Sequence, residues 1–164
     1  AANDQKRGRS FSKLLSAISI TAKDDPNPEF NPRLRTAIEK AKAGQVPSDN
    51  IDRAIKKSSK LKDLEEITME AYGPGGSAII ITAITDNTNR TISEIKQILK
   101  ETENKWADPG SVQWAFEAKI QDGEKTYFPK FPQEITPEDK EKLENLIEKL
   151  EDQPDTQNIT HNAK

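Results

Sequence analysis

The stretch ITMEAYGPGGSAIIITAI, residues 67–84, contains the pattern that decides the fold of this 164-residue chain. Residues 67–72 alternate in the manner of a half-buried strand, and residues 78–84 form an apolar run of strand length. Gly73-Pro74-Gly75-Gly76, between them, is typical of a tight turn. The stretch therefore predicts two consecutive strands at the start of a sheet.

The chain after this stretch alternates between helical and strand patterns. Apolar residues from Ile92 to Leu99 recur at helical spacing, and the next strand is expected to place Val112, Trp114 and Phe116 on its buried face. Asp122-Gly123 predicts a hairpin with a return strand over residues 126–128.

A second helix and a last strand complete the C-terminal part. Thr136-Pro137 has the residue types of a helix start, and a short strand is expected over residues 156–160. The order β-β-α-β-β-α-β predicts an α+β sandwich over residues 61–164, with helices on one face of a mainly antiparallel sheet.

The chain before residue 61 has the pattern of a separate helical domain, residues 1–60, joined by a polar linker at residues 58–65. Ser10 is the expected N-cap of its first helix. Asn31 and Pro32 are expected to begin the second helix, which ends at Gly44. Ser48 is the expected cap of the third helix, so this domain is predicted to be a three-helix bundle.

Composition excludes several classes of protein. Hydrophobic and charged residues each make up 32% of the chain, there is no cysteine, and the mean hydropathy is -0.87. No apolar run approaches the ~20 residues of a membrane span, and cysteine-based metal, disulfide or nucleophile sites are excluded. A lone histidine, His161, and a glycine turn that lacks the Gly-Lys-Ser/Thr of a phosphate loop leave no specific support for an enzyme or a cofactor.

The charge distribution is more informative than the net charge of -3. Residues 1–60 carry 13 Lys/Arg against 7 Asp/Glu, whereas residues 61–164 carry 12 against 21. Cations on helix faces supply sequence-independent affinity for phosphates, although a merely solvated charged face has the same pattern. The candidate nucleic-acid-binding residues are Lys6, Arg7, Arg9, Lys13, Arg33, Arg35, Lys40, Lys42, Arg53, Lys56 and Lys57.

A polar loop and two tryptophans have alternative interpretations. Asn87, Asn89 and Arg90 are a candidate secondary contact, unless the loop only connects a strand to a helix capped by Asp86, Thr88 or Asn89. Trp106, in a predicted loop, is either an exposed contact or a satellite of the core. Trp114 is expected in the core.

Motifs along nearly the whole chain resemble the YebC/PmpR family, which includes the mitochondrial translational activator of cytochrome c oxidase. In the helical domain they are Asn31-Pro32-Arg33-Leu34-Arg35, Lys40-Ala41-Lys42-Ala43 and residues 50–57 (NIDRAIKK). In the α+β domain they are Tyr72-Gly73-Pro74-Gly75-Gly76, Thr85-Asp86-Asn87, Asn89-Arg90-Thr91, Gly110-Ser111-Val112 with Trp114 and Phe116, and Leu150-Glu151-Asp152 with Gln157-Asn158.

The resemblance implies a non-enzymatic protein without a cofactor that binds nucleic acid. Bacterial members are described as DNA-binding transcriptional regulators, and other members act in translation, on ribosomes, relieving stalling on proline-rich nascent chains. We expect a ribosome-associated translation factor that contacts rRNA or tRNA. The alternatives are a DNA-binding transcriptional regulator and a protein-interaction adaptor that uses the acidic domain. We expect a cytoplasmic monomer, with the mitochondrial matrix left open.

Three departures from the family pattern are visible. The family's basic N-terminal leader is absent before Ala1, and a glycine-rich stretch is replaced by residues 103–108 (ENKWAD). A third domain, usually inserted between the strands near 116–120 and 126–128, is represented by only a few residues around 119–125. The sequence is compatible with either a compact family member or a chain from which that domain has been left out.

Overall fold

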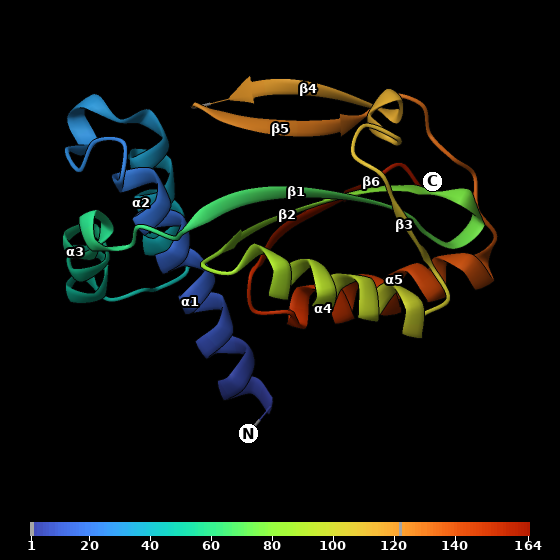
Figure 1. The fold of residues 1–164 in the computed structure, drawn as a ribbon, viewed down its shortest axis with the longest axis horizontal. Coiled ribbons are helices and arrows are strands. Elements are labelled where there is room, and N and C mark those ends of the chain that lie inside the picture. Colours follow the sequence, from blue (N-terminus) through green and yellow to red (C-terminus); the bar gives the residue numbers. More distant parts are fainter. Residues whose placement is uncertain (1, 122) are drawn as a thin grey trace.

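The computed structural model describes residues 2–121 and 123–164, with side chains described from Arg7 onward except at Asp122. Its helices are α1 (Ala2–Ala22), α2 (Pro32–Ala43), α3 (Ser48–Lys57), α4 (Thr88–Glu101) and α5 (Pro137–Asp152). Its strands are β1 (Glu65–Tyr72), β2 (Ala78–Thr85), β3 (Lys105–Ala107), β4 (Phe116–Gln121), β5 (Glu124–Pro129) and β6 (Thr156–His161). Figure 1 shows α1–α3 at one end of a sheet and the remaining elements layered on it.

Helices α1, α2 and α3 pack around a small apolar core that includes Ile18 and Leu34, both fully buried. Asn31 caps α2 by accepting the Leu34 backbone N–H at 3.1 Å. The side-chain amide of Asn31 also donates to the carbonyls of Thr21 and Asp25, at 2.7 and 2.8 Å. One side chain therefore connects the end of α1 to the start of α2, as the Asn-Pro pattern predicted in part.

The predicted starts of the first and third helices were wrong. Ser10 lies inside α1, which already begins at Ala2, because the apolar periodicity marks only the part of the helix that packs. Ser48 is the first helical residue of α3. Pro47 occupies the N-cap position with an extended backbone and makes no side-chain cap bond.

The main sheet has four strands in the order β3-β1-β2-β6, and every neighbouring pair is antiparallel. Helices α4 and α5 cover one face of it (Figure 1), where Ile79 and Ile81 of β2 pack against Ile95, Leu99 and Leu146. Thr136 caps α5, as predicted. The α+β prediction, with helices on one face of an antiparallel sheet, is confirmed.

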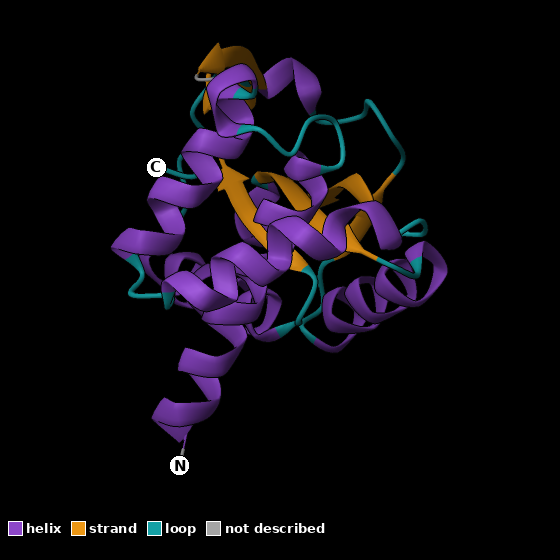
Figure 2. Cartoon of the chain, turned by 90° about the vertical axis from the view of Figure 1, so that its left-hand side faces the viewer, coloured by secondary structure: helices purple, strands orange, loops and turns teal. Residues whose placement is uncertain are grey.

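The opposite face of the sheet is covered in part by a hairpin of β4 and β5. Ile80 packs there with Val112, Phe116 and Tyr127. Figure 2 views the molecule from the α1–α3 end, with this hairpin at the top and the first turns of α1 at the bottom. The hairpin was predicted at Asp122-Gly123, of which Asp122 lies outside the described residues.

Trp114 was predicted as a core residue on a strand, and this prediction was wrong. The strand begins only at Phe116, residues 113–115 form a 3-10 turn, and Trp114 is 60% exposed. The buried carboxylate of Glu70 accepts the backbone N–H groups of Gly110 and Val112, which holds the preceding loop outside the sheet. The alternating apolar residues Val112, Trp114 and Phe116 therefore have a strand pattern, although the loop held by the buried Glu70 carboxylate leads into a turn.

Trp106 lies in β3 rather than in a loop. It is partly buried against the core beneath α4, with the Lys96 ammonium 4.9 Å from its ring centroid. Of the two interpretations of Trp106, the satellite of the core is the one observed.

Candidate nucleic-acid interface

Four of the ten predicted cations whose side chains the structure describes contact the α+β part of the chain. Arg9 pairs with Asp152 at 3.3 Å and Lys40 with Glu124 at 3.1 Å. Arg33 pairs with Glu66, on β1. These three cations hold the helices against the sheet domain through carboxylates that are distant in the sequence.

Lys13 is the fourth cation at this junction. Its ammonium donates to the backbone carbonyl of Glu151, and burial lowers the pKa of Lys13. The backbone carbonyl of Lys13 in turn accepts the side-chain amide of Gln157 at 3.1 Å. The opposite net charges of the two halves therefore contribute to the contacts between them, and not only to the binding of a ligand.

The other predicted cations outside α3 have varied surroundings. Arg35 donates to the carbonyls of Pro28 and Glu29, at 2.8 and 3.1 Å, and braces the turn before α2. Arg7 lies over the ring of Phe11 at 5.7 Å, and Lys42 is exposed. The side chain of Lys6 lies outside the described residues.

Helix α3 presents its cations to solvent. Arg53, Lys56 and Lys57 are exposed, whereas Ile51 and Ala54 on the opposite side face the bundle core. Arg53 donates to the side-chain oxygen of Asn50 at 2.7 Å, which orients the guanidinium along the helix.

A groove of about 740 Å³ runs between this helix and the sheet domain. Its walls come from α1, α3, residues 60–64 and the loop between β2 and α4. Its cationic lining residues are Arg53, Lys57, Lys60, Lys62 and Arg90, and its acidic ones are Asp63, Asp86 and Asp155. The structure thus brings Arg53 and Lys57 of the primary prediction beside Arg90 of the secondary one.

Lys60 and Lys62 are lining residues that the sequence analysis missed. They belong to the lysine-rich stretch at 58–65, which was interpreted only as a linker. Residues 58–60 form a 3-10 turn that continues directly from α3. That continuity places both lysines beside Lys57, and the lysine density was the signal that could have identified them.

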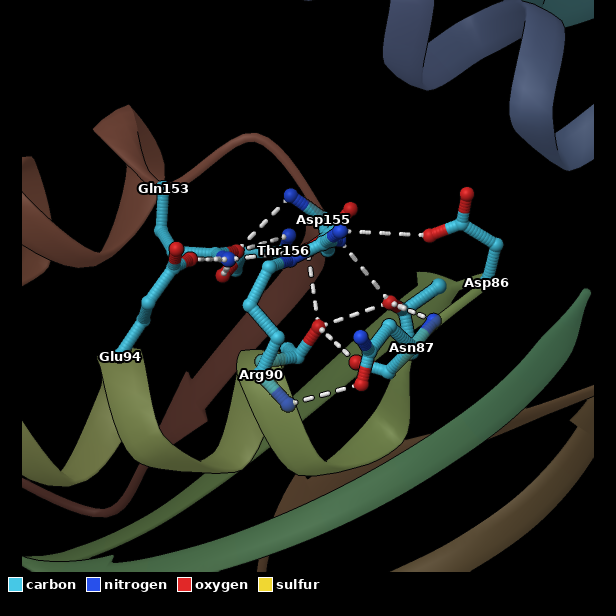
Figure 3. Close-up of polar contacts among 9 residues, drawn as sticks. Asp86, Asn87, Arg90, Glu94, Gln153, Asp155 and Thr156 are labelled. Carbon is cyan, nitrogen blue, oxygen red and sulfur yellow. Dashed lines mark hydrogen bonds and ion pairs between the residues drawn. The ribbon is translucent and has the colours of Figure 1, made fainter.

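The β2–α4 loop is built around the carboxylate of Asp155 (Figure 3). This carboxylate accepts hydrogen bonds from Arg90 at 2.9 Å, the Thr91 hydroxyl at 2.8 Å and the Gln153 amide at 3.1 Å. Arg90 also pairs with Asp86 at 3.4 Å. Arg90 is therefore fixed in position while its side chain stays 45% exposed to the groove.

Asn87, and none of the three predicted alternatives, is the cap of α4. Its side-chain oxygen accepts the Arg90 backbone N–H at 3.1 Å, so this exposed side chain has a structural role. Asn89 is exposed on the first turn.

Both charges of the Asp155–Arg90 pair persist at neutral pH. Burial acts to raise the pKa of Asp155, but hydrogen bonds from Arg90, Thr91 and Gln153 outweigh it and hold that pKa below its usual value. The hydrogen bond to Asp155 raises the pKa of Arg90.

The groove has the chemistry of a polyanion contact. Guanidinium and ammonium groups can bind phosphates, with the arginines offering bidentate geometry.

Among the side chains that the structure describes, no group of three or more His, Cys, Asp or Glu is placed to hold a metal ion. None of the helices in the described part of the chain is long and apolar enough to cross a membrane.

Fold and site together define a class of protein: a basic three-helix domain docked on an antiparallel α+β domain, with a cationic groove at the junction. A model of the TACO1/YebC protein N-terminal domain matches residues 1–61, and a model of the TACO1/YebC second and third domain matches residues 64–121 and 117–163. The chain belongs to the TACO1/YebC family.

Known relatives support this assignment. A probable transcriptional regulatory protein of Geotalea uraniireducens is 47% identical over 122 residues, which are 72% of this chain and 49% of that protein. The chain thus spans about half the length of such relatives. The crystal structure of a conserved hypothetical protein, Aq1575 from Aquifex aeolicus, superposes with a TM-score of 0.88 at 30% identity, covering 97% of this chain and 90% of that one.

A longer alignment indicates that at least one relative has residues that this chain lacks. The probable transcriptional regulatory protein Teth39_1009 of Thermoanaerobacter pseudethanolicus is 35% identical over 224 residues, covering 98% of this chain and 90% of that protein. That span exceeds the 164 residues present here. The match to the model of the second and third domain is in two segments that overlap at 117–121, in β4, next to residues 119–125, where the family resemblance predicts the third domain.

Proposed function

We propose that this protein is a non-enzymatic regulator of gene expression that binds RNA on the ribosome, contacting rRNA or tRNA backbone through the groove at the domain junction. The convergence of Arg53, Lys57 and Arg90, with Lys60 and Lys62, on one groove supports the proposal most directly. The expected consequence of this binding is relief of stalling on proline-rich sequences.

The shape of the groove favours an irregular RNA element over a DNA duplex. A recognition helix must enter the major groove, about 12 Å wide, with its base-contacting side chains leading. On α3, Arg53 and Lys57 instead face a groove whose far wall is the β2–α4 loop of the sheet domain. Side chains that face such a groove are not placed as those of a recognition helix are, which favours a backbone contact over base readout.

A DNA-binding transcriptional regulator is the second candidate function. The Geotalea and Thermoanaerobacter relatives are named probable transcriptional regulatory proteins, which supports a role in transcription. Phosphate contacts through the same groove would serve DNA as well, because counterion release does not depend on sequence.

A charge-reversal experiment tests the proposal. The variant Arg53→Glu/Lys57→Glu should lose at least about tenfold in affinity for ribosomes and for rRNA, because two phosphate contacts become repulsive. The matched control is Lys140→Glu/Lys142→Glu, which makes the same charge change on exposed positions of α5. A reporter with a proline run should stall with the groove variant and not with the control.

Crosslinking in cells followed by sequencing of the bound nucleic acid separates the candidates. Recovery of rRNA or tRNA supports the ribosomal role, and recovery of promoter DNA supports the transcriptional one. Ribosome binding that survives the groove reversal would contradict the groove contact, whereas ribosome binding by residues 61–164 alone would support the adaptor hypothesis.

A further inference from the structure

An exposed aromatic pair lies on the sheet domain, away from the groove. The rings of Trp114 and Phe131 have centroids 6.1 Å apart with their planes inclined at 33°. Trp114 is 60% exposed and Phe131 52% exposed. Lys130 places its ammonium 5.5 Å from the Phe131 ring centroid. Two large rings therefore face solvent together beside a cation.

A buried acid fixes the loop that carries Trp114. Glu70 is only 3% exposed and accepts hydrogen bonds from the backbone N–H groups of Gly110 and Val112, and from the Gln113 side chain. Gly110 has a φ of 89°, a conformation that favours glycine. A buried carboxylate is costly unless several donors satisfy it, so the position of this loop is strongly specified.

Phe131 is fixed against the same loop. The backbone N–H groups of Lys130 and Phe131 both donate to the carbonyl of Ala115, at 2.7 and 3.2 Å. Ala115 itself is completely buried. The aromatic pair is thus held by backbone contacts on both sides, which makes it a preorganised surface.

We propose that Trp114 and Phe131 form a stacking platform for an unpaired base of the RNA whose backbone the groove binds. The inference rests on the proposed function. More than half of the surface of each side chain is exposed and can meet a planar base, and aromatic stacking accepts any base. Lys130, whose ammonium is 5.5 Å from the Phe131 ring centroid, supplies a cation for the phosphate of the stacked nucleotide. In the described part of the chain, no carboxylate pairs with this lysine.

The platform is distant from the expected insertion point of the family's third domain. The expected insertion point is the tip of the hairpin, where Glu124 pairs with Lys40 of α2. Trp114 precedes the base of the same hairpin, at Phe116. A six-residue strand spans about 17–20 Å, so the aromatic pair lies at the other end of the hairpin.

Tryptophan fluorescence tests the platform in the full chain. In a Trp106→Phe background, Trp114 is the remaining tryptophan of the chain, and single-stranded oligouridylate should quench it. Heparin, a polyanion without bases, should bind the groove without quenching. Trp114→Ala in the wild-type background should weaken oligouridylate binding by roughly 5- to 150-fold, and Trp114→Phe should restore most of it.

Controls separate the platform from the groove. Phe30→Ala removes another exposed aromatic ring, on the helical domain, and should leave the affinity unchanged. If oligouridylate binds with full affinity while Trp114 is unquenched, the platform is wrong and the groove stands. If rRNA and oligouridylate both fail to bind the wild-type protein, the proposed function itself fails. Self-association that depends on Trp114 in sedimentation would overturn the proposal in favour of a protein contact.

Discussion

Replacing Asp155 by Asn should destabilise the protein, because one carboxylate organises the whole β2–α4 loop. The side chain of Asp155 is 16% exposed and accepts hydrogen bonds from Arg90, Thr91 and Gln153. Asparagine keeps the shape but removes the charge and one acceptor oxygen. All three donors bond the same carboxylate oxygen, Oδ2, so an amide oxygen in its place would accept them without the negative charge that strengthens each bond.

The expected loss is about 2–3 kcal/mol at neutral pH. Hydrogen bonds to a charged group contribute about 1.5–3 kcal/mol each, but the bond to Arg90 must be discounted because its guanidinium is largely solvated. For a chain of this length, the melting temperature should fall by about 4–12 °C. That shift is large enough to measure by thermal or urea unfolding.

The pH dependence supplies the sharper test. Because the folded pKa of Asp155 lies below its ordinary value of 3.8, the carboxylate contributes its full stabilisation above that value. The contribution is lost as the pH falls through the lowered folded pKa. Wild type and Asp155→Asn should therefore differ at pH 7 and converge in strong acid.

Urea unfolding followed by circular dichroism at several pH values measures this difference. Glu144→Gln, on an exposed position of α5, is the matched control and should show no gap at neutral pH. A gap below about 0.5 kcal/mol at pH 7, or one that does not change with pH, would refute the reasoning.

Three further predictions follow from local geometry. Asn31→Ala should cost about 2 kcal/mol and Thr136→Ala about 1 kcal/mol in urea unfolding, because Asn31 bonds two carbonyls besides capping its helix. Gly75→Ala should lower the melting temperature, since its φ is 69° and a Cβ there would lie 2.5 Å from Ile135; Gly76→Ala, at φ 78° but in open space, separates strain from clash. Burial lowers the pKa of His161 in the folded protein, so the free energy of unfolding should rise with pH between this lowered pKa and the ordinary value of 6.5. His161→Gln should remove this rise from the melting temperature measured against pH.

Local signals in the sequence predicted most of the fold. Asn31-Pro32 and Thr136-Pro137 marked helix starts that the structure confirms, because cap and proline effects involve neighbouring residues only. The Gly73–Gly76 turn and its two strands were predicted for the same reason. The prediction that Trp114 lies in the core was wrong because Glu70, which holds the loop before Trp114, lies in another strand.

The candidate site was only partly predictable. Helical spacing identified Arg53 and Lys57, but the partners of Arg9 and Lys40 are 143 and 84 residues away in the sequence. No local pattern shows which cation meets a carboxylate across the junction. Arg90 and α3 likewise line the same groove only because the two domains pack together, which no local pattern indicates.

Through the ion pairs between the two halves, the acidic domain competes with a nucleic acid for cations of the helical domain. Asp152, Glu66 and Glu124 occupy cations that a phosphate chain would otherwise neutralise. Exposed pairs of this kind contribute about 1 kcal/mol or less each, so a long polyanion could displace them. Binding would then break these ion pairs, and the same cations would contact phosphates instead. The distance between the helical bundle and the sheet, followed by a pair of fluorophores, would report whether a bound polyanion has displaced these ion pairs.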